Sequence, residues 1–152
     1  MTLLVEAATI TLADPTIYTE DGVYYLTGTS SGSGFVMYKS TDLIHWERCG
    51  NATGGLALHK DDVWGTAGFW APQIFKHDGS YYMAYTANEL IAIAKADSPM
   101  GPFKQEVQQE LPHDTGQIDP FVFIDDDGRK YLYYVRFVGG NTLYVNELND
   151  DF

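Results

Sequence analysis

Two aspartates in this sequence have the chemistry to act together on a sugar. Asp14 and Asp119 each stand directly before a proline, and a third, similar segment has Trp70-Ala71 in the same place. One carboxylate can activate a water molecule while a second tunes proton transfer, and an indole ring can stack on a pyranose or furanose. Whether these side chains cooperate depends on the elements that position them, because an isolated Asp-Pro dipeptide is common turn chemistry.

The three segments that begin at these positions repeat one pattern. They read DPTIYTEDGVYYLTG from Asp14, APQIFKHDGSYYMAY from Ala71 and DPFVFIDDDGRKYLYY from Asp119. Each has proline second, then an alternating apolar stretch, an Asp-Gly pair and a tyrosine-rich stretch, which together predict a β-hairpin. The hairpins are expected to turn at Asp21-Gly22, Asp78-Gly79 and Asp127-Gly128.

Each hairpin is followed by a looser repeat that predicts further strands. The matching stretches are residues 34–47, 90–103 and 141–152, and no segment keeps a helical period for more than two turns. An all-β chain built from four-stranded antiparallel units of about 50 residues is typical of a β-propeller. A β-sandwich also has many short strands, but it does not explain the same proline entry three times.

The chain is therefore predicted to be a partial propeller domain with about two and a half blades. The blades are expected at about 1–60, about 64–113 and, incomplete, about 117–152. The first strand of every propeller blade lines the central channel in the same direction, so equivalent residues lie at one level. Asp14 and Asp119 should then meet at one mouth of the channel, with Trp70-Ala71 between them.

The composition limits the partners and the location. A net charge of −12 and a pI near 4.4 argue against nucleic acid and anionic membranes, which are themselves negative. The single cysteine allows no internal disulfide, and the four histidines show no metal-ligand spacing, so no metal site is expected. The N-terminus has no basic stretch before an apolar one, and no run approaches the roughly 20 apolar residues of a membrane span. The expected location is the cytoplasm.

Five motifs occur in order along the chain: ADPTIY, SGFVMYKSTDLIHWE, FWAPQIFKHDGSYYMAYTA, IAIAKADSPMGPF and IDPFVFIDDDGRKYLYY. Together they resemble glycoside hydrolase family 43 and cover nearly the whole sequence. The resemblance implies a five-bladed β-propeller that hydrolyses xylan- or arabinan-derived saccharides, of the β-xylosidase, α-L-arabinofuranosidase or arabinanase type. It also implies that this chain is the N-terminal half of such a propeller.

Matched motif by motif, the resemblance implies roles for six residues. Asp14 would be the general base that activates water for inverting attack at the anomeric carbon. Asp119 would raise the pKa of the catalytic acid and orient it. The residues implied to line the pocket for the −1 sugar are Phe35, Trp70, Ala71 and Ile118. The partner is then a small oligosaccharide or glycoside.

One part of the family pattern lies outside this sequence. In the family, a glutamate in the fourth blade protonates the leaving oxygen, and a histidine in the last blade helps to hold a channel ion in many members. This sequence has no glutamate in the place expected for that acid. The glutamates considered for the role and rejected are Glu89, Glu106, Glu110 and Glu147. No cofactor is expected to be required for the chemistry, and the ligands of a structural channel ion are not identifiable. Because one acid–base group commonly contributes about 10²- to 10⁴-fold, the isolated chain is expected to be a weak or inactive catalyst.

Three interpretations are open at this point. The chain is the N-terminal half of a hydrolase, or a short protein whose copies close the ring, or a carbohydrate-binding or scaffold propeller without turnover. The first two predict a homo-oligomer or association with the missing half, because an unclosed propeller leaves strand edges and apolar faces exposed.

Overall fold

The computed structural model describes residues 9–30, 32–149 and 152, which form an all-β chain. Within these ranges the only helical segments are two short 3-10 turns, Thr53–Gly55 and Lys60–Asp62. Neither has the length or the apolar character needed to cross a membrane. The predicted first and third blades include residues 1–8, 31 and 150–151, which lie outside the described residues.

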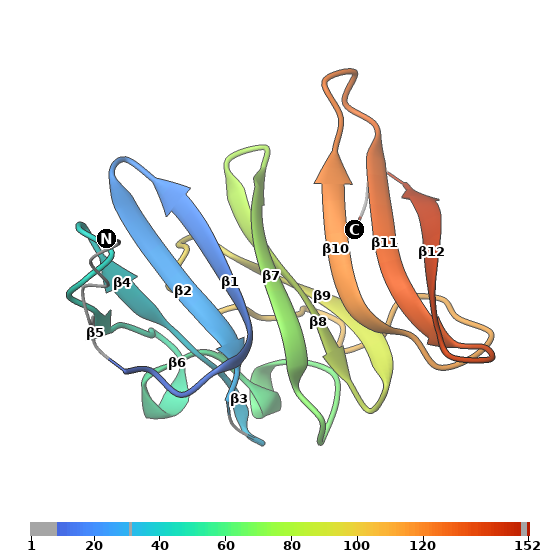
Figure 1. Cartoon of the computed structure of the whole chain (residues 1–152), viewed down its shortest axis with the longest axis horizontal. Coiled ribbons are helices and arrows are strands. Elements are labelled where there is room, and N and C mark those ends of the chain that lie inside the picture. The colour runs from blue at the N-terminus through green and yellow to red at the C-terminus, as the bar shows by residue number, and fades with distance from the viewer. Residues whose placement is uncertain (1–8, 31, 150–151) are drawn as a thin grey trace, which may run out of the picture.

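Most of the strands form three antiparallel sheets that follow one another along the chain (Figure 1). The first consists of β1 (Ala13–Glu20), β2 (Val23–Thr29), β4 (Tyr38–Ser40) and β5 (Glu47–Arg48). The second consists of β7 (Trp70–His77), β8 (Ser80–Ala87) and β9 (Leu90–Ala96). The third consists of β10 (Ile118–Ile124), β11 (Lys130–Phe137) and β12 (Asn141–Leu148). A separate two-stranded sheet pairs β3 (Gly34–Val36) with β6 (Leu56–His59).

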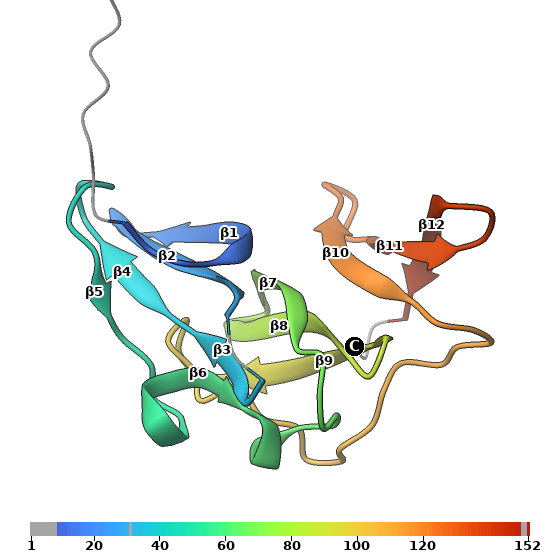
Figure 2. The same cartoon turned by 60° about the horizontal axis from the view of Figure 1, so that its bottom comes forward.

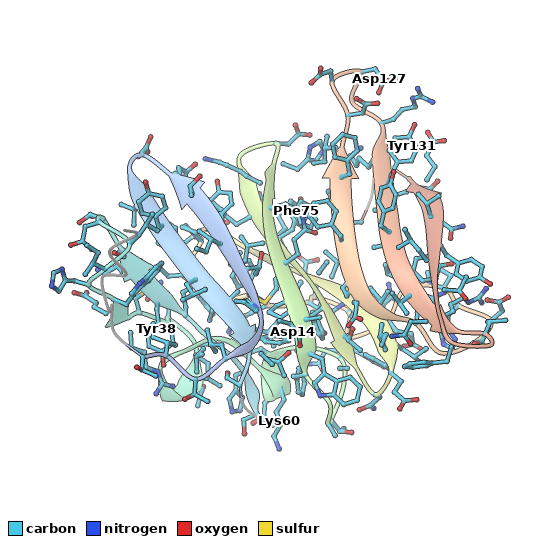
Figure 3. All side chains as sticks on the ribbon, viewed as in Figure 1. Asp14, Tyr38, Lys60, Phe75, Asp127 and Tyr131 are labelled. Atoms are coloured by element: carbon cyan, nitrogen blue, oxygen red, sulfur yellow. The ribbon has the colours of Figure 1, made fainter. Side chains whose placement is uncertain are left out.

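The first strands of the three sheets lie next to one another. β7 contacts both β1 and β10, and the strands follow in the order β1, β7, β10 in both views (Figures 1 and 2). The hairpin turns gather at one end of these strands and the proline entries at the other; Figure 3 labels Asp127 at the first end and Asp14 at the second. This is the arrangement of blades around a propeller channel, and it confirms the predicted all-β propeller type.

Two of the three predicted hairpin turns have the two-residue form. In Asp21-Gly22 the φ angles are 49° and 76°, and in Asp78-Gly79 they are 45° and 77°. Positive φ at both central residues is the type I′ turn, which matches the twist of the flanking strands and which Asp-Gly adopts readily. The third connection is longer, because residues 125–129 separate β10 from β11, with positive φ at Gly128.

The outer strands are less regular than the predicted four-stranded units. In the second blade the expected fourth strand is reduced to isolated bridges that join Lys104 to Lys95 and Phe103 to Leu58. Pro99 and Pro102 precede these bridges and cannot donate to a ladder, which accounts for the interruption. In the first blade the predicted third strand is divided at Met37, so that β3 pairs with β6 and β4 pairs with β2.

The core lies between the blades, and β8 supplies both of its halves. Met83 and Tyr85 belong to the cluster shared with the first blade, whereas Ala84 belongs to the cluster shared with the third. Successive side chains of a strand point to opposite faces, so a strand between two blades must be apolar on both sides. The second cluster contains Phe75, Ile91, Ile93, Val122, Leu132 and Tyr134.

An ion-pair cluster ties the first blade to the second near the hairpin ends. The Glu20 carboxylate on β1 accepts hydrogen bonds from the Lys76 ammonium on β7 and from the Tyr81 hydroxyl on β8. The bond from Lys76 first, and that from Tyr81 second, hold the pKa of Glu20 below its ordinary value. Because the pKa of Glu20 is lower in the folded chain than in the unfolded chain, this cluster stabilises the fold at pH values above the ordinary glutamate pKa of about 4.3. The contribution is lost as the pH falls from there through the lowered pKa.

The third sheet has one covered face and one open face. Val122, Leu132 and Tyr134 pack against the second blade. On the opposite face the side chains of Phe121, Phe123, Leu143 and Val145 are between 45% and 66% exposed. Continuous apolar surfaces of this kind commonly mark interaction sites.

Candidate active site

The two aspartates occupy equivalent backbone positions at the start of their strands. Asp14, Ala71 and Asp119 all have a left-handed conformation, with φ of 47°, 44° and 56°. Each lies where the pairing register shifts at the start of the first strand of its blade. Bulges of this kind bend a strand and re-aim a side chain, and they are frequent beside active sites. The equivalence expected from the repeat therefore holds in three dimensions.

The local sequence explains why the bulge forms. In the first blade, Asp14 and Pro15 lie between the paired residues Ala13 and Thr16, so the proline, which has no N–H, occupies the irregular stretch of the ladder. Aspartate tolerates the left-handed region better than most residues. Gly28 faces the bulge at close range, since a Cβ there would lie 2.5 Å from the Ala13 carbonyl oxygen.

Two threonine hydroxyls tie these bulges to the neighbouring blade. Thr29 Oγ1 on β2 donates to Asp14 Oδ2 at 2.6 Å and accepts from the Ala71 backbone N–H at 2.9 Å. Thr86 Oγ1 on β8 accepts from the Asp119 backbone N–H at 3.1 Å. Each hydroxyl therefore fixes the position of the first strand of the next blade, β7 or β10, relative to its own blade.

The negative charge of Asp14 acts on the carboxyl group of Asp119. The pKa of Asp119 is raised, first because the carboxyl group is partly desolvated and second because of the negative charge of Asp14. The residue as a whole is exposed, so the desolvation is only partial. The charge of Asp14 therefore reaches Asp119 across β7, the strand that contacts both β1 and β10.

The residues expected to line a sugar pocket differ in accessibility. Trp70 is 38% exposed, and its indole lies over Gly68, where a Cβ would be 3.2 Å from the ring. Ala71 is half-buried, and Ile118 is 8% exposed. Trp70 is therefore the residue of this group that offers a broad apolar surface to a ligand.

Phe35 is placed differently from the expectation. Its side chain is 0% exposed, and its ring packs edge-on against Phe69 and Tyr85 with centroids 5.9 Å away in both cases. β3 directs this ring into the cluster between the first two blades rather than toward the aspartates. A ring without exposed surface cannot contact a sugar, so the structure does not support Phe35 as a pocket residue.

The threonines are functional candidates that the sequence interpretation missed. Thr29 stands opposite Ala13 and Thr86 stands opposite Trp70, so both hold the same place in their blades. The signal was present, because each threonine follows its bulge residue by the same number of positions in the repeat.

Among the described residues, no three or more His, Cys, Asp or Glu side chains gather closely enough to hold a metal ion.

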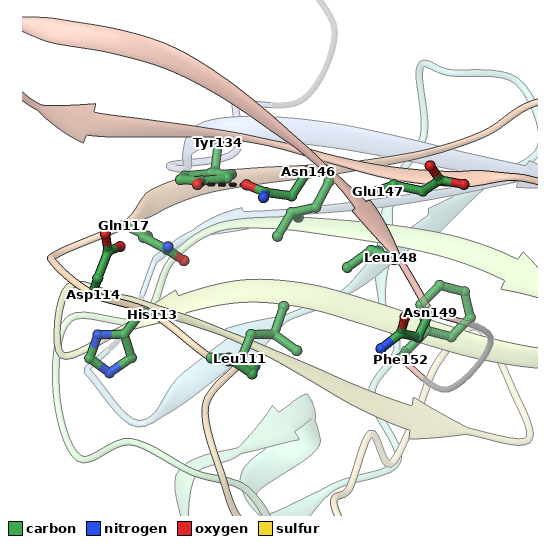
Figure 4. Close-up of a pocket in the computed structure, with 12 residues that line it drawn as sticks. Leu111, His113, Asp114, Gln117, Tyr134, Asn146, Glu147, Leu148, Asn149 and Phe152 are labelled. Atoms are coloured by element: carbon green, nitrogen blue, oxygen red, sulfur yellow. Dashed lines mark hydrogen bonds between the residues drawn. The ribbon is translucent and has the colours of Figure 1, made fainter.

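A separate cavity of about 470 Å³ lies between residues 111–117 and the sheet of β11 and β12 (Figure 4). Its lining includes His113, Asp114 and Asn146, and the Asn146 amide oxygen accepts a hydrogen bond from Tyr134 at 2.8 Å. The described lining contains none of the candidate catalytic residues, so this cavity is not the site formed by the two aspartates.

Comparison with known proteins places the chain in a family. The model for glycosyl hydrolases family 43 matches residues 8–152. The chain belongs to glycosyl hydrolase family 43. Among characterised relatives, this family 43 chain is 34% identical over 104 residues to xylosidase/arabinosidase 43A from Humicola insolens, a match that covers 64% of this chain and 31% of that protein. It is 26% identical to an extracellular exo-α-(1→5)-L-arabinofuranosidase from Cellvibrio japonicus, with 95% of this chain and 46% of that protein covered.

Solved structures of the family have the same fold. An endo-1,4-β-xylanase structure from Bacteroides thetaiotaomicron superimposes with a TM-score of 0.84 at 41% identity and covers 92% of this chain and 48% of that one. An endo-arabinase structure from the same organism gives a TM-score of 0.77 at 28% identity, with 94% and 52% covered. The family 43 chain therefore spans about half the length of these structures, and half or less of the two relatives named above.

Proposed function

We propose that this chain supplies the water-activating side of an inverting glycosidase that acts on xylan- or arabinan-derived saccharides. The observation that carries the proposal is the pair of carboxylates, Asp14 and Asp119, held in equivalent bulges at the start of their strands, where the charge of Asp14 raises the pKa of Asp119. The exposed indole of Trp70 stands beside the bulge that lies between them. The relatives named above are xylosidases, arabinofuranosidases or arabinanases, which supports a pentose-containing substrate.

In this mechanism Asp14 accepts a proton from a water molecule as the water oxygen bonds to the anomeric carbon. The bond from that carbon to the leaving oxygen breaks at the same time, and the leaving oxygen takes a proton from a separate acid. The negative charge of Asp119 raises the pKa of that acid, so that the acid holds its proton until the leaving oxygen takes it. The acid itself is proposed to come from outside this chain.

The choice of leaving group tests whether this chain supplies the base but not the acid. A 2,4-dinitrophenyl β-D-xyloside or α-L-arabinofuranoside releases a phenolate that needs no proton, so the chain should hydrolyse it without an acid. A 4-nitrophenyl or unsubstituted phenyl glycoside should react slower by about 10²- to 10⁴-fold, the usual contribution of one acid–base group. Proton NMR of the first sugar product should show inverted anomeric configuration.

The same assay contains its control. The matching 2,4-dinitrophenyl β-D-glucoside should react more slowly than the 2,4-dinitrophenyl β-D-xyloside, because its hydroxymethyl group on C5 has no counterpart in the xyloside. Retained configuration, or equal rates for the glucoside and the two pentosides, would contradict the proposal. Saturable sugar binding without any release of dinitrophenolate would favour the second candidate, a carbohydrate-binding propeller, for which the exposed Trp70 is the supporting feature.

We also propose that the open face of the third sheet is covered by another blade. In a preparation of this chain alone the available partner is a second copy, so sedimentation velocity should show a dimer or a larger species. Replacing Phe121 and Leu143 with lysine should shift it toward 17.0 kDa monomers. Lysine at Val107, which is 67% exposed outside this sheet, is the matched control. A compact monomer of the parent chain would show that the face needs no cover.

A further inference from the structure

One hydroxyl group contacts both the candidate base and the next blade. Thr29 Oγ1 lies 2.6 Å from Asp14 Oδ2 and 2.9 Å from the Ala71 backbone nitrogen. The amide can only donate, so it occupies a lone pair of Oγ1 and leaves the single hydroxyl hydrogen for the carboxylate. The hydroxyl therefore links a side chain of the first blade to the main chain of the second.

This contact restrains an exposed side chain. Asp14 is exposed, and no second described residue donates to its carboxylate. A distance of 2.6 Å is typical of a hydroxyl that donates to an ionised carboxylate, which is among the stronger hydrogen bonds in proteins. With Oδ2 held by Thr29, Oδ1 is the oxygen left to accept a proton from water.

The second blade provides an internal comparison. Thr86 makes the same bond between blades, to the Asp119 backbone N–H, but the bulge residue of its own blade is Ala71. Thr86 therefore has no carboxylate in the place where Thr29 has Asp14. The shared bond is structural, and the bond to the carboxylate is the feature that distinguishes Thr29.

We propose that Thr29 is a positioning residue for the reaction. Its hydroxyl holds Asp14 in one rotamer, with Oδ1 free for the attacking water, and at a fixed place relative to Trp70-Ala71. The inference rests on the proposed function, in which Asp14 is the base. A displacement of reacting groups by about 1 Å can cost on the order of 10²-fold in rate, so a lost anchor should be measurable.

The test uses three variants of the full chain. Thr29→Val keeps the shape and removes the hydroxyl, Thr29→Ser keeps the hydroxyl, and Thr86→Val removes only a bond between blades. Thr29→Val should lower kcat for the 2,4-dinitrophenyl pentoside by about 10- to 100-fold, with KM changed by less than about threefold. Thr29→Ser should restore kcat to within about threefold of the parent, and Thr29→Val and Thr86→Val should lower Tm by similar amounts.

A second measurement does not depend on turnover. Three-bond NMR couplings to the Asp14 side chain should report one χ1 rotamer in the parent and in Thr29→Ser, and averaged rotamers in Thr29→Val. A single unchanged rotamer in Thr29→Val would overturn the inference. So would averaged rotamers with an unchanged kcat, or a loss of kcat that Thr29→Ser fails to restore. If no variant hydrolyses the pentosides, the proposed function fails, and the couplings still decide whether Thr29 orients Asp14.

Discussion

Asp14→Asn should lower the rate of hydrolysis of a 2,4-dinitrophenyl pentoside by about 10²- to 10⁴-fold while the fold is retained. An amide cannot take the proton of the attacking water, and no second carboxylate occupies the bulge of the first blade. Asparagine is a better choice than alanine, because Asp14 has φ of 47° and asparagine tolerates the left-handed region. Steady-state kinetics together with thermal denaturation would separate lost chemistry from lost structure.

Asp21→Asn is the matched control for this prediction. Asp21 belongs to the same blade as Asp14 and has nearly the same φ, 49°, but it lies in the turn at the far end of β1. Its replacement should leave kcat unchanged. If Asp14→Asn keeps the parent rate, or if Asp21→Asn loses as much, Asp14 is not the base. The removal of the Asp14 charge should also bring the pKa of Asp119 closer to its ordinary value, because that charge is one of the two causes of its rise.

Phe35→Ala should lower the free energy of unfolding by about 3–5 kcal/mol, the usual cost of deleting a fully buried aromatic side chain. The ring is 0% exposed and lies against Phe69 and Tyr85 in the cluster between the first two blades. Because a domain is stable by only about 5–15 kcal/mol, this loss is a large part of the total. Chemical denaturation is the measurement, with sugar affinity determined on the folded fraction.

Trp70→Ala provides the opposite case. Its indole is partly exposed and stands over Gly68, so its loss should weaken pentose binding with a small effect on unfolding. Phe35→Leu retains most of the apolar volume and should recover much of the stability lost in Phe35→Ala. If Phe35→Ala kept the parent stability but lost sugar binding, the prediction that this ring serves the core and not the sugar would be wrong.

The repeat and the equivalence of the two aspartates could be predicted from the sequence because both depend on local backbone chemistry. An Asp-Gly pair between alternating strands specifies a type I′ turn within a few residues, and two of the three turns have that form. A proline directly after Asp14, Ala71 and Asp119 marks the same irregularity in the ladder each time. When a repeat is built from turns and bulges, the order of residues alone places equivalent side chains at one level.

Contacts between blades could not be predicted in this way. Phe35 follows a glycine-rich stretch in a motif that suggested a sugar pocket, yet the division of the strand at Met37 and the pairing of β3 with β6 direct it into the core. The outer strand near Phe103 depends on a parallel bridge to Leu58, a residue far away in the sequence.

The sequence by itself thus determined the all-β fold, the repeated hairpins and the equivalent backbone positions of Asp14 and Asp119. Only the tertiary structure decided what surrounds them: the buried position of Phe35, the exposed indole of Trp70 and the hydroxyl of Thr29 between two blades. The physical reason is the distance along the sequence over which each feature is determined. Turns and bulges are set by the φ preferences of neighbouring residues, whereas burial and hydrogen bonds between blades depend on how whole sheets pack against one another.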